Sequence, residues 1–291
     1  MKFFNLYTFF CLILLISIII ILYKLYRKND VHPLQNSPHF VNYIKNIHPN
    51  LYPIKISDFS SNNNEKFYQT YLSKLNKPSL HQLEILHNYT DYIDNLLLKQ
   101  GIHGLDKVNW LFLISDNELE KSMPFTLGEY IIISKKDIIL MERKKTKHFI
   151  EILIHEKLHV LQRKYQLQFN SFYKRTYKFL HKRLKLSEVP LHIKTNYMTN
   201  PDSNFDFWTY KWNKTIYYPY LKYNFKNDSI NDCLLSKSST MGDINKFKDF
   251  IKVKYHNISI YHPNEIFAYT VSKHILDNSL DEVFVKFLNA L

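Results

Sequence analysis

The run from Phe149 to Arg163 (FIEILIHEKLHVLQR) constrains the fold of this chain more than any other segment. Its many apolar residues recur with helical spacing and predict a buried helix. His155, Glu156 and His159 stand in the middle of this helix in the order H-E-x-x-H. Histidines four residues apart lie one above the other on the same helical face. Because buried polar side chains need partners, the spacing predicts that both imidazoles bind one metal ion.

The residue types in this pattern suit hydrolysis with zinc. A catalytic zinc ion takes three protein ligands and keeps a fourth position for water, whose pKa it lowers. A carboxylate beside the first histidine, here Glu156, can act as the general base that takes the proton of that water and later delivers it to the leaving amine. The alternative is a helix in which His155 and His159 are ordinary core residues that bind no metal.

The H-E-x-x-H pattern resembles the active-site helix of the zincin metallopeptidases. Their metzincin branch would carry glycine at position 162 and histidine at position 165, where this chain has Gln162 and Tyr165. The family also favours uncharged residues between the glutamate and the second histidine, whereas Lys157 is charged, and we expect its amine to reach solvent along an apolar stem. Gln162 follows His159 on the same helical face, and we expect it to orient a ligand.

The gluzincin branch takes its third ligand from a glutamate on a later helix, and the run YHPNEIFAYTVSKHIL resembles that helix at Asn264 and Glu265. Pro263 suits a first helical turn, and the apolar residues after it give the helix a buried face. We expect Asn264 to support a ligand. The resemblance implies one Zn²⁺ per chain with three ligands: His155, His159 and Glu265.

Other assignments stay open for the third ligand. Glu265 can be a carboxylate that is favoured only by the helix dipole. His262, three residues earlier, and Asp202, in the segment TNPDSNFDFW, carry donor atoms that zinc also accepts. Tyr269 stands where the thermolysin-like members of the branch carry an acidic residue.

The resemblance implies an α+β fold with two lobes, and we expect this domain to follow an N-terminal transmembrane helix. The first lobe, over about residues 61–168, would hold a small mixed sheet and the active-site helix, with an edge strand able to hold an extended peptide. Its sequence predicts a helix over 79–100 opened by a capping box, a buried strand over 108–115, and a hairpin of 129–134 with 137–142.

The second lobe, over about residues 169–291, is expected to be mostly helical. A basic amphipathic stretch covers 170–185, and the last helix would open with a capping box of Ser279 and Glu282. Between them lies a tyrosine-rich stretch over 208–223. A hydroxyl from Tyr217, Tyr218 or Tyr220 can donate to the oxyanion of a tetrahedral intermediate, or these residues can be packed aromatics.

Residues Phe3–Tyr23 form an uncharged run of 21 residues, which is long enough to span a bilayer and passes directly into YKLYRKND. We therefore expect a transmembrane anchor over 1–28 and a linker over 29–60. The basic residues after the span and the lack of a disulfide framework (Cys11 and Cys233 only) favour a body on the cytoplasmic or virion-interior side. The sequons at Asn88, Asn213, Asn227 and Asn257 point the other way.

The net charge of +13 is concentrated around the predicted active-site helix. Residues 135–185 hold 15 Lys or Arg and 4 Asp or Glu. This charge can attract an acidic partner or an anionic lipid surface, or it can be a solvated face, and no signature of specific nucleic-acid recognition accompanies it.

The combined prediction is a membrane-anchored, zinc-dependent peptidase acting on a peptide or protein substrate. It is similar to uncharacterised zincin-like proteins of giant DNA viruses in the segments LIHEKLHVLQR and PNEIFAY. The alternative is a catalytically inactive zincin-like protein, or a basic structural or interaction protein on a membrane surface.

Overall fold

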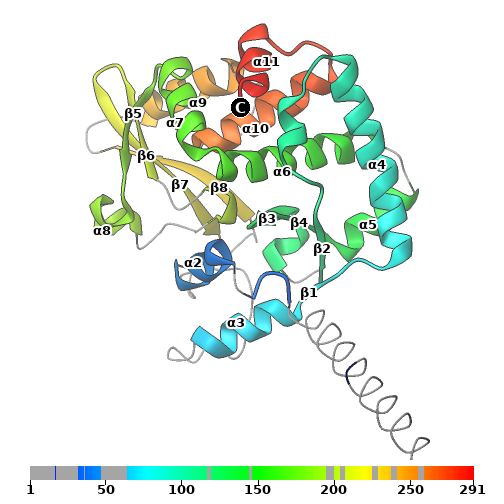
Figure 1. The fold of residues 1–291 in the computed structure, drawn as a ribbon. Coiled ribbons are helices and arrows are strands. Elements are labelled where there is room, and N and C mark those ends of the chain that lie inside the picture. Colours follow the sequence, from blue (N-terminus) through cyan, green and yellow to red (C-terminus); the bar gives the residue numbers. More distant parts are fainter. Residues whose placement is uncertain are drawn as a thin grey trace, which may run out of the picture.

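The computed structural model describes Ser17 and residues 32–35, 37–46, 64–116, 119–143, 146–194, 200–203, 207–224, 229–236, 241–254 and 259–291. In this part of the chain helices pack around two four-stranded sheets (Figure 1). The helices α6 (Lys147–Lys164) and α10 (Pro263–Leu276) make the most extensive contact between helices and form the centre of the molecule. The predicted α+β class is confirmed.

The first sheet has the order β1-β2-β4-β3 and lies against α6. Its strands are β1 (Leu75–Asn76), β2 (Phe112–Ser115), β3 (Phe125–Leu127) and β4 (Tyr130–Ser134). β2 and β4 are parallel, and β3 is an antiparallel edge strand, so the predicted mixed sheet is confirmed. Ile131 and Ile133 of β4 face the large core with α6, whereas Ile132 faces a second core on the other side. Both faces of the sheet are therefore covered.

The predicted hairpin is wrong in its second arm, because Lys135–Arg143 forms the helix α5. The Ser134 hydroxyl accepts a hydrogen bond from the Asp137 backbone N–H (3.1 Å), which is how a helix start is capped. Ile138 and Met141, three residues apart, are buried, whereas Ile139 is exposed, so the burial has helical rather than strand period. The hairpin partner of β4 is β3.

Helix α4 (Leu80–Lys99) confirms the helix predicted over 79–100. The Ser79 hydroxyl accepts from the Gln82 backbone N–H, and the Gln82 side chain accepts from the Ser79 N–H, so the predicted capping box is present. Gly101, with φ +66°, follows the last turn. The strand predicted over 108–115 is shorter than expected and begins at Phe112.

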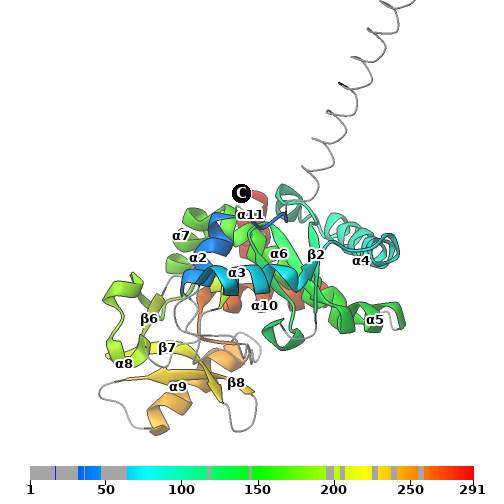
Figure 2. The ribbon, with the colours of Figure 1, turned by 90° about the horizontal axis from the view of Figure 1, so that it is seen from below.

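Two helices, α2 (Pro38–Asn46) and α3 (Asn64–Ser73), cover the second core of the first sheet (Figure 2). Leu34, Phe40, Tyr43 and Tyr71 are fully buried there. Part of the segment 29–60 that was predicted as a linker is therefore folded, because the apolar side chains of Leu34, Phe40, Tyr43 and Ile44 fill this core.

The predicted transmembrane run lies outside the described residues, apart from Ser17. Among the helices that the structure describes, none has both the length and the apolar character needed to cross a membrane.

A second sheet of four antiparallel strands, in the order β5-β6-β7-β8, follows α7 (Gln166–Thr176). The strands are β5 (Leu180–Leu184), β6 (Phe207–Trp212), β7 (Thr215–Asn224) and β8 (Ser229–Leu235). The prediction of a mostly helical second lobe is therefore wrong here: the basic stretch over 170–185 changes from helix to strand. Its last part pairs with the aromatic strand β6, and this long-range pairing is absent from the local pattern.

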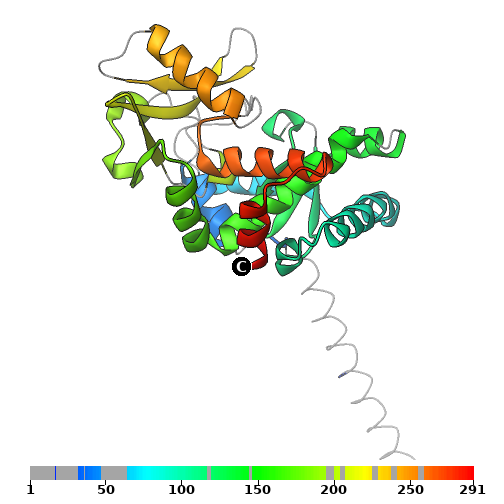
Figure 3. The same cartoon turned by 90° about the horizontal axis from the view of Figure 1, so that it is seen from above.

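Helix α9 (Met241–Lys254) lies on the second sheet (Figure 3). The ring of its Phe247 contacts Tyr210, Trp212 and Tyr217. Tyr217 is buried in this core, and Tyr218 and Tyr220 pack against Leu184, Val189, Ile193 and Phe207 of a smaller cluster. A short helix, α8 (Leu191–Lys194), contributes to that cluster. The three tyrosines thus have packing roles, which is the second of the two predicted alternatives.

The last helix, α11 (Glu282–Asn289), begins two residues later than a cap at Ser279 predicts. Asp281 is its N-cap and accepts a hydrogen bond from the Val283 backbone N–H (2.9 Å). Ser279, predicted as the cap, instead pairs with the His274 ring (2.8 Å), so the predicted capping box is wrong.

Candidate metal centre

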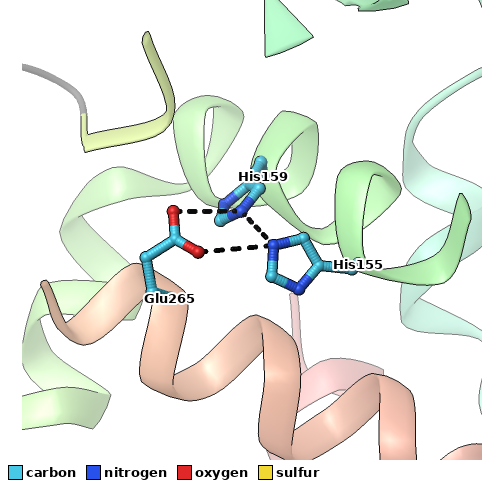
Figure 4. Close-up of side chains that lie close together, drawn as sticks. All are labelled: His155, His159 and Glu265. Carbon is cyan, nitrogen blue, oxygen red and sulfur yellow. Dashed lines mark hydrogen bonds and ion pairs between the residues drawn. The ribbon is translucent and has the colours of Figure 1, made fainter. Parts of the chain in front are cut away.

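His155 and His159 project from the same side of α6, as their spacing predicts (Figure 4). Both are buried, and their Nε2 atoms lie 2.8 Å apart with the rings nearly perpendicular. The helix holds them firmly because Leu153, Leu158 and Leu161 on its other sides are buried in the large core. The two ring nitrogens therefore face one common point.

Helix α10 brings Glu265 to this point. His262 is the N-cap, and its Nδ1 accepts a hydrogen bond from the Asn264 backbone N–H (3.1 Å). Pro263 occupies the first turn, as predicted, and Glu265 stands in the same turn, where the helix dipole favours a carboxylate. Its Oε2 lies 3.4 Å from His155 Nε2, and its Oε1 lies 3.5 Å from His159 Nε2.

The donor types at this point are ones that zinc accepts, and two of the three distances between them match its tetrahedral spacing. Zinc takes imidazole nitrogen and carboxylate oxygen at about 2.0–2.1 Å, so two tetrahedral ligands are about 3.3–3.4 Å apart. The two nitrogen–oxygen distances match this spacing, whereas the two Nε2 atoms, 2.8 Å apart, lie closer together than two ligands of one zinc ion would. His155, His159 and Glu265 each place one ligand atom within 4.8 Å of the others, so the structure brings the three predicted ligands together.

The charges of the centre are tightly linked. Burial opposes protonation of His159, but the carboxylates of Glu265, Asp202 and Glu156 outweigh burial and raise its pKa to about 10. Burial by itself would raise the pKa of Glu265, but His159 and His155 hold it well below its ordinary value. Burial, followed by the neighbouring His159, lowers the pKa of His155. The centre thus favours positive charge between its carboxylates, which is the electrostatic requirement of a cation site.

Gln162 lies beside His159 on the same face of α6, as its spacing predicts. Its Oε1 is 2.7 Å from His159 Nδ1, and its side-chain N–H donates to the Asn264 carbonyl (2.9 Å). Asn264 in turn donates to the Asp202 carbonyl (3.0 Å) and accepts from the Tyr173 hydroxyl (3.0 Å). This hydrogen-bond chain fixes the His159 ring so that Nε2 points into the centre, and it ties α6 to α10.

His155 has a different environment. Its Nδ1 is buried and makes no hydrogen bond to the described residues. The ring of Tyr269 packs against it at a centroid distance of 4.2 Å, and Tyr269 keeps 39% of its surface exposed. Tyr269 therefore forms a half-exposed aromatic wall beside His155.

Two residues that support Glu265 were not identified from the sequence. The Tyr261 hydroxyl donates to Glu265 Oε1 (3.1 Å), and the Asn200 amide lies 3.5 Å from the same oxygen and also contacts the Tyr261 hydroxyl. Tyr261 precedes Glu265 by four residues, which is a signal the sequence carries. Asn200 comes from a distant segment and has no such signal.

Arg163 is a third residue whose role appears only in the structure. Its partly buried guanidinium donates to the carbonyls of Gly128 (2.9 Å) and Pro201 (3.2 Å) and to the Thr126 hydroxyl. Burial lowers its pKa to about 10, while Asp202 and Glu156 act in the opposite direction. It connects the end of α6 to the edge strand β3 and to the 3₁₀ segment η5 (Pro201–Ser203).

Glu156 lies beside the three donors on α6, and its Oε2 is buried without a hydrogen-bond partner among the described residues. Burial, followed by the Asp202 carboxylate, raises the pKa of Glu156 well above its ordinary value. Glu156, His159 and Asp202 form a second group whose ligand atoms lie within 4.8 Å of one another. Asp202 therefore faces the same space as the predicted base.

Lys157 does not reach solvent, so that prediction is wrong. The residue is 2% exposed, and its amine lies 3.9 Å from the centre of the Trp110 ring and 3.5 Å from Asp94 Oδ1. The Trp110 indole N–H also donates to the Asp94 carboxylate (3.0 Å). The cation–π contact and the ion pair compensate the buried charge and fasten α6 to α4.

His262, an alternative for the third ligand, serves as the cap of α10 and is absent from both groups of candidate ligands. Its burial lowers its pKa to about 3. Asp202, the other alternative, belongs to the second group and not to the first.

No protein-family model, curated protein or solved structure matches the chain.

Proposed function

We propose that the protein is a zinc-dependent peptidase similar to the gluzincins, with His155, His159 and Glu265 as ligands and Glu156 as general base. The observation that carries this proposal is the convergence of three donors from two helices on one point, next to a buried carboxylate with an unpaired oxygen. A helix that only packs has no need for two buried imidazoles that face a buried carboxylate.

A zinc ion held by these residues would lower the pKa of a water molecule and polarise a substrate carbonyl. Glu156 has the properties of the group that moves the proton. Burial raises its pKa, so the carboxylate has more affinity for a proton than an exposed glutamate has. Its burial removes competing water, and its place one residue after His155 sets it beside the ligands.

The other residues hold the reacting groups in place. Gln162 fixes His159, and Tyr261 with Asn200 fixes Glu265. The exposed side of Tyr269 offers an aromatic surface to a peptide side chain beside His155. We propose that a transmembrane run over 3–23 keeps this centre at a membrane surface, where the basic residues of 135–185 attract acidic partners or anionic lipid.

Metal analysis of the detergent-purified full chain tests the proposal. We expect one zinc per chain, lost in His159→Ala and retained in Glu156→Gln, which should have no peptide hydrolysis. His87→Ala, an exposed histidine on α4, is the matched control and should keep the metal. Equal zinc content in His159→Ala and the parent chain, or undiminished cleavage by Glu156→Gln, would refute the assignment.

A further inference from the structure

A pocket of about 630 Å³ lies at the end of α6, where the chain enters α2. Its lining comes from the segments 33–39, 107–111 and 128–130 and from the last turns of α6. The zinc ligands proposed above and Glu156 are not among its described lining residues. A pocket of this size is large enough for a small molecule or for the head of a lipid.

Part of the lining is apolar. Leu34, Val108 and Val160 are buried, and Pro33 and Leu111 add further apolar surface. Covering such surface with an apolar group removes it from water, which is favourable. The pocket therefore favours a ligand with an apolar portion.

The rest of the lining is mainly basic. Lys107 and Lys164 are exposed, and Glu129 is the single acidic residue among the lining residues that the structure describes. The Lys164 amine donates to the Lys107 carbonyl (2.6 Å), which uses one of its three N–H groups and holds the amine at the pocket. A lysine ammonium is a strong partner for a phosphate group. The basic and apolar parts together match an amphiphilic anion.

Close contacts fix the walls of the pocket. The Gly128 N–H donates to His39 Nδ1 (3.2 Å), and the Gly128 carbonyl accepts from Arg163 (2.9 Å). Gly128 has φ +59°, and a Cβ atom there would come within 2.9 Å of the Ser37 hydroxyl oxygen. Burial lowers the pKa of His39 to about 2, so its ring stays neutral. The pocket thus lies between well-packed elements, and the lysines supply the attraction for an anion.

The position of the pocket along the chain favours a lipid as the source of that anion. The uncharged run Phe3–Tyr23 ends ten residues before Pro33, and ten residues span at most about 35 Å. With the run across a bilayer, as proposed above, the lining of the pocket begins within that distance of the membrane. Anionic phospholipids carry both a phosphate group and an apolar portion.

We propose that this pocket binds a phosphate-bearing amphiphile, with Lys107 and Lys164 on the phosphate group and the apolar lining against the adjoining hydrocarbon. An anionic phospholipid and a soluble phosphate ester with an apolar group share this chemistry and differ in whether they come from a membrane. The site is separate from the zinc centre and does not depend on it.

Native mass spectrometry of the detergent-purified full chain measures the binding. Dioleoyl phosphatidic acid, dioleoyl phosphatidylcholine and naphthyl phosphate are each titrated against the chain. We expect one phosphatidic acid per chain, bound at least about tenfold more tightly than phosphatidylcholine, because the choline cation neutralises the charge of the phosphate group.

Single substitutions locate the binding. Lys107→Gln and Lys164→Gln each remove one charge at an exposed position and should each weaken binding about tenfold, as the loss of a charge-assisted hydrogen bond implies. Lys174→Gln, at an exposed position of α7, removes the same charge elsewhere and should match the parent chain. Asn109→Trp fills an exposed part of the lining without changing any charge and should also weaken binding.

Each outcome decides the proposal. Phosphatidic acid bound in this pattern would establish a lipid site, and naphthyl phosphate bound in this pattern without phosphatidic acid would establish a site for a soluble phosphate ester. Equal affinity in all variants, an equal loss in Lys174→Gln and Lys164→Gln, or no binding of either ligand would overturn the proposal. The substituted residues lie outside the zinc centre, so failure here leaves that centre untouched, and a failed metal analysis leaves the pocket untouched.

Discussion

Glu120 provides a quantitative test of how the N-terminal helices are joined to the body. It lies in the 3₁₀ segment η3 (Leu119–Ser122), where Glu120, Lys121 and Ser122 all have φ between 45° and 62°. This left-handed turn directs the carboxylate inward, where it is 4% exposed. Its Oε1 accepts from the hydroxyls of Tyr43 in α2 (2.5 Å) and Tyr71 in α3 (2.9 Å).

The expected effect of pH on stability follows from this burial. Burial raises the pKa of Glu120 from 4.5 to about 8; the Tyr43 hydrogen bond acts against this rise, and the Asp202 charge adds to it. Between these two values the folded state holds a proton that the unfolded state has lost, so stability falls as pH rises through this window. The free energy of unfolding falls by about 1.4 kcal/mol for each pH unit in this window, which amounts to a loss of roughly 5 kcal/mol over the whole interval.

The measurement is urea unfolding of the parent chain and of Glu120→Gln at about pH 5 and at about pH 8. The amide cannot ionise, so between these two pH values the variant should gain about 3–4 kcal/mol of unfolding free energy relative to the parent chain, because the parent is already partly ionised at each end of the interval. Glu84→Gln, at an exposed position of α4, controls for the loss of one carboxyl group. A difference between Glu120→Gln and the parent chain that does not change with pH would refute the reasoning.

Three other substitutions test the supporting contacts. Gln162→Leu should lower zinc affinity by about 10- to 100-fold in a chelator competition, because His159 Nδ1 loses its partner; unchanged affinity would remove Gln162 from this role. Lys157→Met keeps the volume of the stem and should change the free energy of unfolding by less than about 1.5 kcal/mol; a larger loss would show that the ion pair stabilises the fold. Gly104→Ala would place a Cβ atom 2.0 Å from the Leu288 carbonyl oxygen and should cost about 1–3 kcal/mol by thermal unfolding, and an unchanged melting temperature would contradict that close packing.

Elements with strong local signals were predicted well. The capping box at Ser79, the period of the run around His155, and Pro263 at a helix start identified α4, α6 and α10. Each of these signals arises from residues a few positions apart along the chain, so it can be identified without knowledge of the fold.

Elements whose state depends on partners elsewhere were predicted poorly. The run 137–142 became a helix because Ser134 caps it and because β4 pairs with β3 and β2 on either side, which leaves no place for another strand next to it. Residues 180–184 became a strand because β6 lies beside them. Leu34, Phe40, Tyr43 and Ile44 belong to the folded body because they bury the apolar second face of the first sheet.

The sequence by itself determined the chemistry of the candidate centre and the helix that carries most of it. Spacing of four residues is enough to align two imidazoles, because a helix fixes their relative position whatever surrounds it. The sequence also indicated Glu265, through the helix start at Pro263 and the resemblance to gluzincins. It could not show that Glu265 reaches the histidines.

Only the tertiary structure decided which distant residues surround that helix. The hydrogen bond between Gln162 and Asn264 joins residues 102 positions apart, and the bonds of Asp202 to Thr126 and of Tyr43 to Glu120 each span more than 70. Such contacts form because burying the apolar faces of α6, α10 and the first sheet brings their polar residues together, and those residues must then satisfy one another. The pattern of neighbouring residues does not show which distant residues will come into contact. The positions of Asn200, Asp202 and Arg163 at the centre therefore follow only from the fold.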